Sequence, residues 1–533
     1  MFTLQDISYL HPNKDLLFEN ISLTVNLHEK VALIGNNGVG KSTLLRIIAR
    51  DLQPSGGQLE FTSDAYYVPQ HFGQYNDWTV AQALRIDDKL HALKEILEGR
   101  VTQSNLDTLN DDWTIEERCR EALNHWQLQN IVLDQKMSSL SGGEKTKVLL
   151  AGISIHQPKL VLMDEPSNHL DKRGRALLYD FLRSSSFTLI VVSHDRKLLN
   201  ALSTVCELRK TGVKIYGGNY DFYAAQKQIE NNALNQDIHN REKALRKAKE
   251  KERESIERQQ RLDSRGKKKQ VKAGVARIMM NTLRNNAENS TSKIKSAHAE
   301  KTGGLAQELQ DLRSVLPDID KMKFLFDNSS LHKGKVLFKG TDINFAYNTR
   351  PLWEENLDIE IASGERIALH GENGSGKTTL IKIVLGDLTA GKGTVFKAEA
   401  RAVYIDQDYS LIDNRLNVYE QAQTFNSAAL EEHEVKIRLN RFLFSKAEWD
   451  KSCSALSGGE KMRLMLCCIT MANQSPDILV LDEPTNNLDI QNIEILTAAI
   501  SAYEGTLLVI SHDEYFLQQI NISRNIQLRN KVG

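Results

Sequence analysis

The sequence has few cysteines, few prolines and no long apolar run. Its cysteines are Cys119, Cys206, Cys453, Cys467 and Cys468. Their spacing fits neither a zinc site nor a disulfide framework, which favours a reducing compartment. No stretch of about 18 apolar residues occurs, so no membrane-spanning helix is expected. The first residues, Met1 to Asp6, lack the basic and apolar segments of a signal peptide, and we therefore expect a cytoplasmic protein.

Acidic residues are scarce relative to basic ones in the middle of the chain. Between Arg241 and Lys301 there are 19 basic and 8 acidic residues, a surplus of 11 positive charges. Because the whole chain carries a net charge of -1, the remainder carries -12. A basic segment between two acidic ones predicts a polyanionic partner.

Proline is absent from Ala224 to about Leu316, and the composition there predicts helices. A helix over Gln226 to Leu262 would be roughly 55 Å long, and we expect it to end at Asp263 to Gly266. A second helix, over Val275 to Lys301, would return toward Gly303-Gly304. This pattern favours a long helical hairpin with a basic tip, and the alternative is a flexible charged linker.

Four short motifs occur twice, in the same order. They are Gly35 to Ser42 and Gly371 to Thr378, Leu140 to Glu144 and Leu456 to Glu460, Leu162 to Pro166 and Val480 to Pro484, and Ser193 to Asp195 and Ser511 to Asp513. The repeat predicts two related domains, over residues 1–223 and 336–533, with the basic helical linker over 224–335.

The first copy is longer than the second by about 20 residues between Gln70 and Ser141. The extra length falls within residues 78–126, a stretch with helical spacing of its leucines. It predicts either an inserted helical arm or a slightly longer helical subdomain.

Short apolar or alternating runs predict strands in both copies. They are Phe2 to Tyr9, Val31 to Ile34, Leu160 to Met163 and Leu189 to Val192 in the first, and Ile343 to Tyr347, Arg366 to Leu369, Ile478 to Leu481 and Leu507 to Ile510 in the second. Strands that alternate with helices indicate an α/β fold with its ligand at the carboxyl ends of the strands.

The glycine-rich loops follow a strand and precede a helix, as a phosphate-binding loop requires. The residues expected to cradle phosphates are Gly35, Asn36, Gly38, Gly40 and Thr43, and Gly371, Glu372, Gly374, Gly376 and Thr379. Lys41 and Lys377 would bind the β- and γ-phosphates. Ser42 and Thr378 would place a hydroxyl on Mg²⁺.

Acidic residues and histidines end the other apolar strands. Asp164 and Asp482 would lie near the metal ion, and Glu165 and Glu483 are the candidates to polarise the attacking water. His194 and His512 could contact the γ-phosphate and orient that water. A single histidine of this kind is more often structural, but its matching position in both copies favours a catalytic role.

With Leu-Ser-Gly-Gly-Glu in each copy, the motifs resemble those of the ATP-binding cassette superfamily. The resemblance covers about Met1 to Tyr223 and Val336 to Arg529. It implies two P-loop cassettes that face each other and bind ATP between the phosphate loop of one and the signature of the other. The signature residues would be Ser457, Gly458 and Gly459 at the first site, and Ser141, Gly142 and Gly143 at the second. Gln70 and Gln407 would be further ligands of Mg²⁺.

The family also stacks an aromatic residue on adenine. Tyr347 occupies that place in the second copy, whereas the first copy has His11, with Tyr9 nearby. Asn487 departs from the Asn-His-Leu-Asp pattern found in the first copy, so the two sites could differ in rate. Both sites keep the residues for phosphate chemistry, and we expect both to hydrolyse ATP.

Two fused cassettes with a long basic linker resemble the ABC-F branch, ATPases that act on ribosomes. The segment Asn219 to Tyr223 is similar to the linker entry of that branch. The resemblance implies that the linker reaches rRNA and the peptidyl-site tRNA. The candidate RNA contacts are Arg265, Lys267, Lys268, Lys269, Lys272 and Arg277. Simple solvation is the alternative for these side chains.

Other functions remain open at this point. The chain could be the ATPase subunit of a membrane transporter, although the basic hairpin then has no purpose. A DNA-repair ATPase would carry its helical insertion inside one cassette, which argues against that class. Within the ribosomal hypothesis, a translation factor and an antibiotic-resistance factor are both possible. We expect a monomer whose two cassettes form an intramolecular dimer.

Overall fold

A computed structural model describes residues 2–61, 64–272, 292, 296, 299–313, 332–347, 350–372, 374–486 and 488–529. They form two compact units, one made of residues 1–223 with 322–533, and the other of residues 224–321. The first unit contains both copies of the repeated motifs. Within the described residues, none of the helices has the length and apolar character needed to cross a membrane.

Two sheets make up the first copy. Their strands are β1 (Phe2–Leu10), β2 (Leu16–Val25), β3 (Lys30–Ile34), β4 (Gly56–Phe61), β5 (Ala65–Val68), β6 (Leu160–Asp164), β7 (Thr188–Val192), β8 (Thr204–Arg209) and β9 (Gly212–Tyr216). The small antiparallel sheet has the order β2-β1-β4, and the large sheet has the order β5-β6-β7-β3-β8-β9. All neighbours in the large sheet are parallel except β8 and β9. The carboxyl ends of β3, β6 and β7 therefore meet at one edge.

The helices of the first copy flank these sheets. They are α1 (Lys41–Ile48), α2 (Val80–Ala83), α3 (Asp87–Leu97), α4 (Gln103–Leu109), α5 (Ile115–His125), α6 (Gly142–His156), α7 (Lys172–Ser184) and α8 (Arg196–Asn200). Helices α3 and α4 pack on each other. The second copy has no helix in its described residues 425–431, between α12 (Val418–Thr424) and α13 (Glu432–Arg441). The extra length of the first copy thus contains the α3–α4 pair.

The second copy repeats this plan. Its remaining elements are β10 (Val336–Asn344), β11 (Leu357–Ala362), β12 (Arg366–His370), α11 (Lys377–Leu385), β13 (Lys392–Lys397), β14 (Ala402–Ile405), α14 (Gly458–Met471), β15 (Ile478–Asp482), α15 (Ile490–Ala502), β16 (Thr506–Ile510), α16 (Glu514–Gln519) and β17 (Arg524–Gln527). The strand orders are β11-β10-β13 and β14-β15-β16-β12-β17.

One strand prediction was wrong. The first strand of the second copy begins at Val336 and ends at Asn344, rather than covering Ile343 to Tyr347. The side chain of Asn344 ends the strand, because its Oδ1 accepts a hydrogen bond from the N–H of Phe345 at 2.9 Å and its Nδ2 donates to the carbonyl of Trp353 at 3.1 Å. The apolar residues that fill the strand lie before Ile343 instead.

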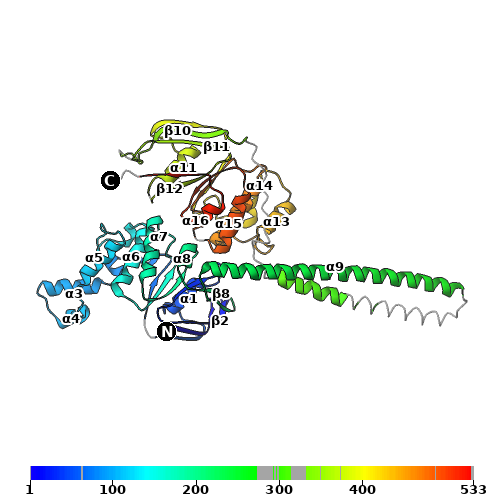
Figure 1. Cartoon of the computed structure of the whole chain (residues 1–533), viewed down its shortest axis with the longest axis horizontal. Coiled ribbons are helices and arrows are strands. Elements are labelled where there is room, and N and C mark those ends of the chain that lie inside the picture. The colour runs from blue at the N-terminus through cyan, green and yellow to red at the C-terminus, as the bar shows by residue number, and fades with distance from the viewer. Residues whose placement is uncertain are drawn as a thin grey trace. The chain divides into compact units, whose positions relative to one another are not determined.

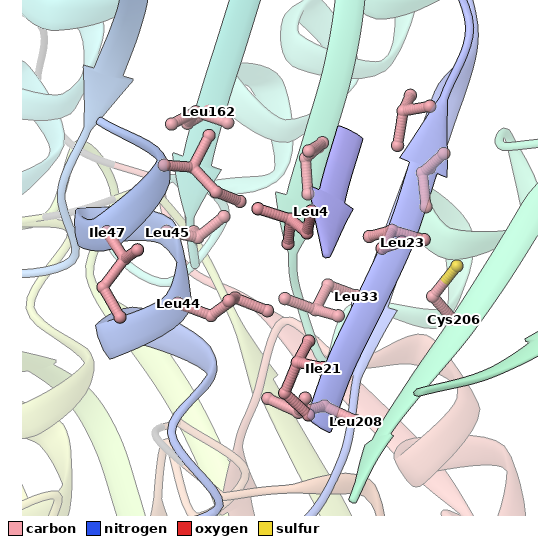
Figure 2. Close-up of a cluster of buried hydrophobic side chains, with 14 of the residues drawn as sticks. Leu4, Ile21, Leu23, Leu33, Leu44, Leu45, Ile47, Leu162, Cys206 and Leu208 are labelled. Atoms are coloured by element: carbon pink, nitrogen blue, oxygen red, sulfur yellow. The ribbon is translucent and has the colours of Figure 1, made fainter. Parts of the chain in front are cut away.

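Leucine, isoleucine and phenylalanine side chains hold the small sheet of the first copy against the large one (Figure 2). Leu4, Leu33 and Leu44, from β1, β3 and α1, are fully buried. Each such side chain contributes roughly 1.5–3 kcal/mol by leaving water. Trp353 and Leu380 are buried in the corresponding cluster of the second copy. These two cores fix the glycine-rich loops that precede α1 and α11.

The second unit contains most of one long helix, α9 (Tyr220–Lys272) (Figure 1). Its 53 residues correspond to about 80 Å. The predicted end at Asp263 to Gly266 was wrong, because one glycine costs only about 1 kcal/mol within a run of good helix formers. Residues 299–313 form a second helical segment, which likewise continues through Gly303-Gly304.

These two helical segments pack side by side (Figure 1). Arg241 pairs with Glu308 at 2.7 Å, and Arg313 pairs with Glu242 at 2.6 Å. Ile238, which is 7% exposed, lies on the same stretch of α9. Most of the second predicted helix, Val275 to Lys301, lies outside the described residues.

Polar contacts within the first copy fix the start of α9. The N–H of Asp221 donates to Asn200 Oδ1, and Asn200 Nδ2 donates back to Asp221 Oδ1, both at 2.9 Å. Tyr220 is buried, and the guanidinium of Arg196 lies over its ring. These contacts fix the first residues of α9, which belong to the first copy.

Candidate nucleotide-binding sites

Each glycine-rich loop closes onto the lysine that follows it. Gly40 and Gly376 adopt left-handed backbone conformations, with φ of 103° and 85°, at the starts of α1 and α11. A Cβ on Gly40 would lie 2.6 Å from the Phe18 ring, so only glycine fits there. Lys41 Nζ donates to the carbonyl of Gly35 at 2.7 Å, and Lys377 Nζ donates to the carbonyl of Gly371 at 2.9 Å.

A pocket lies beside each lysine. The first has a volume of about 400 Å³ and is lined by His11, Leu17, Asn37, Gly38, Gly40, Lys41, Ser42, Thr43, Gln70, Asp164, Glu165, Val192, His194 and Ser457. The second has a volume of about 390 Å³ and is lined by Tyr347, Leu352, Gly374, Ser375, Gly376, Lys377, Thr378, Thr379, Asp482, Glu483 and Ile510. Volumes of 300–1,000 Å³ are usual for small-ligand sites.

A tyrosine contacts the aspartate at the end of each central strand. Tyr67 Oη donates to Asp164 Oδ2 at 3.4 Å, and Tyr404 Oη donates to Asp482 Oδ2 at 2.8 Å. Thr378 Oγ1 also donates to Asp482 Oδ2, at 3.3 Å. Asp164 Oδ1 is buried and has no hydrogen-bond partner among the described residues. A carboxylate oxygen that is left over in a polar pocket fits a hard cation such as Mg²⁺.

The next residue in each copy is a glutamate with an unusual backbone. Glu165 and Glu483 have φ of 51° and 49°, in the left-handed region that glutamate rarely adopts. The N–H of Glu165 donates to the carbonyl of Val192 and that of Glu483 to the carbonyl of Ile510, both at 2.8 Å. These bonds hold the strained conformation. Both copies thus share the same strained backbone at this glutamate.

Each glutamate faces a histidine. His194 Nε2 lies 3.2 Å from Glu165 Oε1, and His512 Nε2 lies 3.3 Å from Glu483 Oε1. In the first copy, the N–H of His194 also donates to Glu165 Oε2 at 3.3 Å. The structure thus brings each candidate glutamate into contact with the candidate histidine of its own copy.

Burial changes the proton affinity of these groups. Burial raises the pKa of Glu165, and the nearby charge of Asp164 raises it further. Burial raises the pKa of Glu483 to about 7, although Arg175 acts in the opposite direction. Burial lowers the pKa of His512 to about 4, so its imidazole is neutral at physiological pH. Glutamates with raised pKa values are suited to accept a proton.

Serine and glutamate of each signature form a capping box at a helix start. The N–H of Ser141 donates to Glu144 Oε2 at 2.8 Å, and that of Ser457 donates to Glu460 Oε2 at 2.7 Å. A Cβ on Gly143 would lie 2.8 Å from the carbonyl oxygen of His169. The second glycine of the signature therefore has a packing role as well as any role in binding.

Two aspartates at helix starts interact with residues of the opposite copy. Asp489 Oδ1 caps α15 by accepting from the N–H of Asn492, and its Oδ2 accepts from the N–H of Asn37 in the other copy at 2.7 Å. Asp489 also raises the pKa of Lys41, against the larger lowering effect of burial. Asp171 has the same effect on Lys377.

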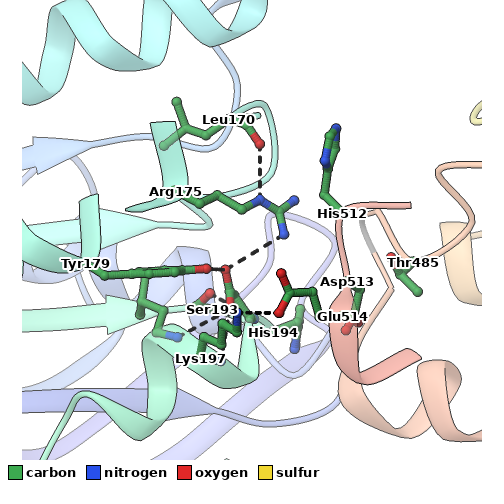
Figure 3. Close-up of polar contacts among 12 residues, drawn as sticks. Leu170, Arg175, Tyr179, Ser193, His194, Lys197, Thr485, His512, Asp513 and Glu514 are labelled. Carbon is green, nitrogen blue, oxygen red and sulfur yellow. Dashed lines mark hydrogen bonds and ion pairs between the residues drawn. The ribbon is translucent and has the colours of Figure 1, made fainter. Parts of the chain in front are cut away.

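Among the described residues, four ion pairs join the two copies, and the charges are arranged the same way in all of them. The basic partner comes from the first copy and the acidic partner from the second: Lys172 with Glu514, Lys197 with Glu514, Arg173 with Glu372, and Arg196 with Glu494. Figure 3 shows Lys197 and Glu514 in contact, beside Arg175. Exposed pairs of this kind contribute about 0–1 kcal/mol each, so their value lies in specificity.

The two pockets differ in what the opposite copy brings to them. Ser457 lines the first pocket, as the resemblance implied, without Gly458 or Gly459. Among the described residues that line the second pocket, Ser141, Gly142, Gly143, Gln407 and His512 are missing. His11 and Tyr347, the candidate adenine contacts, line their respective pockets. Asn487 lies outside the described residues.

The predicted RNA contacts are only partly described. Arg265 is exposed on α9, and Lys267, Lys268, Lys269 and Lys272 lie in the last turns of that helix. Arg277 lies outside the described residues.

Several residues of the sites were not predicted. Tyr67 and Tyr404 each lie three positions before the glutamine of their copy, a repeated spacing that could have revealed them. Asp489 could be seen to be a helix cap, but its bond to Asn37 joins residues 452 positions apart. Nothing local in the sequence indicates such a bond.

Comparisons with known proteins match both copies. The family model described as "ABC transporter" matches residues 18–168 and 354–486. The probable ATP-binding protein YbiT of Escherichia coli O157:H7 is 32% identical over 533 residues, which cover 95% of this chain and 92% of that protein. The ribosome protection protein VmlR of Bacillus subtilis strain 168 is 29% identical, covering 99% of this chain and 87% of that protein.

Solved structures share the fold. The complex of the archaeal ribosomal stalk protein aP1 and the archaeal ribosome recycling factor aABCE1 contains a chain with a TM-score of 0.60 and 19% identity. The match covers 98% of this chain and 87% of that one.

The ABC transporter F family member 5 of Arabidopsis thaliana is 28% identical over 96% of this chain and 73% of its own length. With tandem P-loop cassettes, paired nucleotide pockets and these relatives, the chain belongs to the ATP-binding cassette family, and within it to the ABC-F proteins, and is an ATPase.

Proposed function

We propose that this protein hydrolyses ATP with Mg²⁺ at both pockets and acts on the ribosome in the cytoplasm. The observation that carries the proposal is a long basic helix, α9, joined to two cassettes that are otherwise acidic. A ribosome presents dense phosphate charge, which lysine and arginine neutralise with little regard to sequence. The relative named as a ribosome protection protein, VmlR, supports the same partner.

In the proposed reaction, Lys41 and Lys377 bind the β- and γ-phosphates, helped by the N–H groups of the glycine-rich loops. Glu165 and Glu483 accept hydrogen bonds from the attacking water, and His194 and His512 contact the γ-phosphate. Ser457 and Ser141 approach the γ-phosphate from the opposite copy. ATP would then hold the cassettes together, and its hydrolysis would release them.

Asp164, Ser42 and Gln70 are proposed to hold Mg²⁺ in the first site, and Asp482, Thr378 and Gln407 in the second. The ion would neutralise charge on the phosphates. The buried, unpaired Asp164 Oδ1 supports this assignment. Tyr67 and Tyr404 would orient the aspartates through their hydroxyl groups.

Tyr404→Phe removes that hydroxyl and keeps the ring. We expect the Mg²⁺ concentration for half-maximal ATPase activity to rise about tenfold, because partners that orient a metal ligand typically affect metal affinity by 10–100-fold. A Mg²⁺ titration at saturating ATP measures the effect. Tyr419→Phe is the control, because its hydroxyl contacts only Gln423 among the described residues. An unchanged midpoint for Tyr404→Phe would show that the hydroxyl does not orient Asp482.

Ribosome binding is tested with charge reversal on α9. The triple variant Lys267→Glu, Lys268→Glu, Lys269→Glu should weaken ribosome binding by about 10- to 1,000-fold and flatten its dependence on salt, because three phosphate contacts are lost. Cosedimentation with purified ribosomes and a non-hydrolysable ATP analogue, at several salt concentrations, gives both quantities.

The matched control has the same change of charge on the first cassette: Lys14→Glu, Lys159→Glu, Lys210→Glu. These three lysines are exposed. If both triple variants bind ribosomes equally, or if the unaltered chain does not sediment with ribosomes at all, the proposed partner is wrong. Co-purification with a membrane protein would instead favour a transporter subunit.

Within this function, the linker would act near the peptidyl-tRNA. Two roles fit: a translation factor that relieves poorly placed peptidyl-tRNA, and a factor that protects ribosomes from drugs. Susceptibility to drugs of the peptidyl transferase centre, compared in cells with and without the protein, separates them.

A further inference from the structure

The starts of α7 and α15 are equivalent in the repeat but differ in charge. Asp171 and Asp489 cap the two helices in the same way. Four residues later, the first copy has Arg175 and the second has Ile493. An arginine and an isoleucine at matching positions differ in charge, so the two helix starts are not chemically equivalent.

Arg175 is held in place by its own copy. Its side chain is 13% exposed, its Nε donates to the carbonyl of Leu170 at 3.1 Å, and its Nη1 lies 3.8 Å from Asp195 Oδ2. The hydroxyl of Tyr179 donates to that same oxygen at 2.5 Å. A long side chain fixed at two points has little entropy left to lose when it acts on a neighbour.

The guanidinium of Arg175 points toward the segment of the second copy that carries His512 and Asp513 (Figure 3). All three residues line one small pocket of about 40 Å³, together with Thr485. His512 in turn contacts Glu483, with its Nε2 3.3 Å from Glu483 Oε1. A cation of the first copy thus reaches the candidate catalytic pair of the second.

The reverse contact lacks that charge. Ile493 is buried and uncharged. Arg173 also pairs with Glu372 of the second copy, but both side chains are exposed, so this pair contributes little.

We propose that Arg175 is a positioning residue for the second ATP site only, supplied by the first cassette, where it orients Glu483 and His512 for hydrolysis. The inference rests on the proposed function, ATP hydrolysis at both sites. A fixed cation near the imidazole of His512 favours one orientation of that ring, and the ring contacts Glu483. The second site then depends on where α7 lies, whereas the first site has no equivalent dependence on α15.

The test replaces Arg175 with the residue of the other copy, Arg175→Ile, and measures turnover at each site separately. Vanadate traps ADP only at a site that has hydrolysed ATP. A photoreactive 8-azido-ATP, trapped in this way and mapped to tryptic peptides, shows which cassette carried out the reaction.

We expect the label in the second cassette to fall by roughly 10- to 100-fold, because small displacements of catalytic groups have effects of that size. The label in the first cassette should change less than about twofold. Arg175→Lys should restore part of the label, since it returns the charge without the planar fork. Arg183→Ile, on an exposed position of the same helix, is the control and should leave both labels unchanged.

Three outcomes overturn the inference. An equal fall in both cassettes would mean that Arg175 only stabilises the fold. An unchanged second label would mean that Arg175 does not act there. If the unaltered protein traps no nucleotide in either cassette, the proposed ATP hydrolysis fails and this inference fails with it.

Discussion

Replacing both candidate bases, Glu165→Gln with Glu483→Gln, should lower the rate of ATP hydrolysis by about a thousandfold or more while ATP still binds. A glutamine has the same shape as glutamate but cannot take a proton from water, and loss of a general base typically costs 10²–10⁴-fold. The raised pKa of Glu483, about 7, is the property that this substitution removes. Because ATP stays bound, the variant should also stay on ribosomes.

Two measurements check this result. The turnover number at saturating ATP gives the loss of hydrolysis, and a sucrose gradient with ATP and ribosomes gives retention. Glu121→Gln with Glu504→Gln, at exposed positions of the two copies, is the control. A residual rate above a tenth of normal would remove both glutamates from the reaction. A variant that stays at the top of the gradient would contradict the ribosomal role alone.

Loss of both lysines should abolish nucleotide binding instead. For Lys41→Ala with Lys377→Ala, we expect the Kd for ATP to rise by at least about 100-fold at each site. Each lysine would form more than one charge-assisted hydrogen bond to phosphate, and each bond contributes about 1.5–3 kcal/mol. In addition, the loop carbonyls of Gly35 and Gly371 lose the partner that holds the loop closed.

Binding of a fluorescent ATP analogue, with competition by ATP, measures this effect. Lys382→Ala is the control, because this exposed lysine lies on the same helix as Lys377, one turn further along. Thermal unfolding without nucleotide shows whether the loops still fold. Tight ATP binding by the folded double variant would contradict the assigned role of both lysines.

The sequence predicted the strands that carry the chemistry well, because apolar runs as short as Leu160 to Met163 fit a buried strand better than a helix. It could not predict the left-handed backbone of Glu165. The residues of an Asp-Glu-Pro motif also occur in ordinary turns, so the motif does not indicate a left-handed conformation. The extent of α9 was underestimated because a glycine was given too much weight among strong helix formers. The end of β10 depends on the side chain of Asn344, which a pattern of apolar residues does not reveal.

The role of Arg175 shows a second limit. The difference from Ile493 is visible when the copies are aligned, but its target, His512, is 337 positions away in the sequence. Only the packing of one copy on the other brings the two together. Contacts within a copy follow from local patterns, whereas contacts between copies need the folded chain.

The uniform direction of the ion pairs favours association of a first half with a second half. Arg196 occupies the place in the first copy that Glu514 has in the second. If two first halves met in the same way, Lys172 would face Arg196, and like charges would repel where Lys172 and Glu514 now attract. Two second halves would likewise bring acidic side chains together. The placement of charges thus disfavours the pairing of two identical halves. It favours the pairing of each half with the different half to which it is fused.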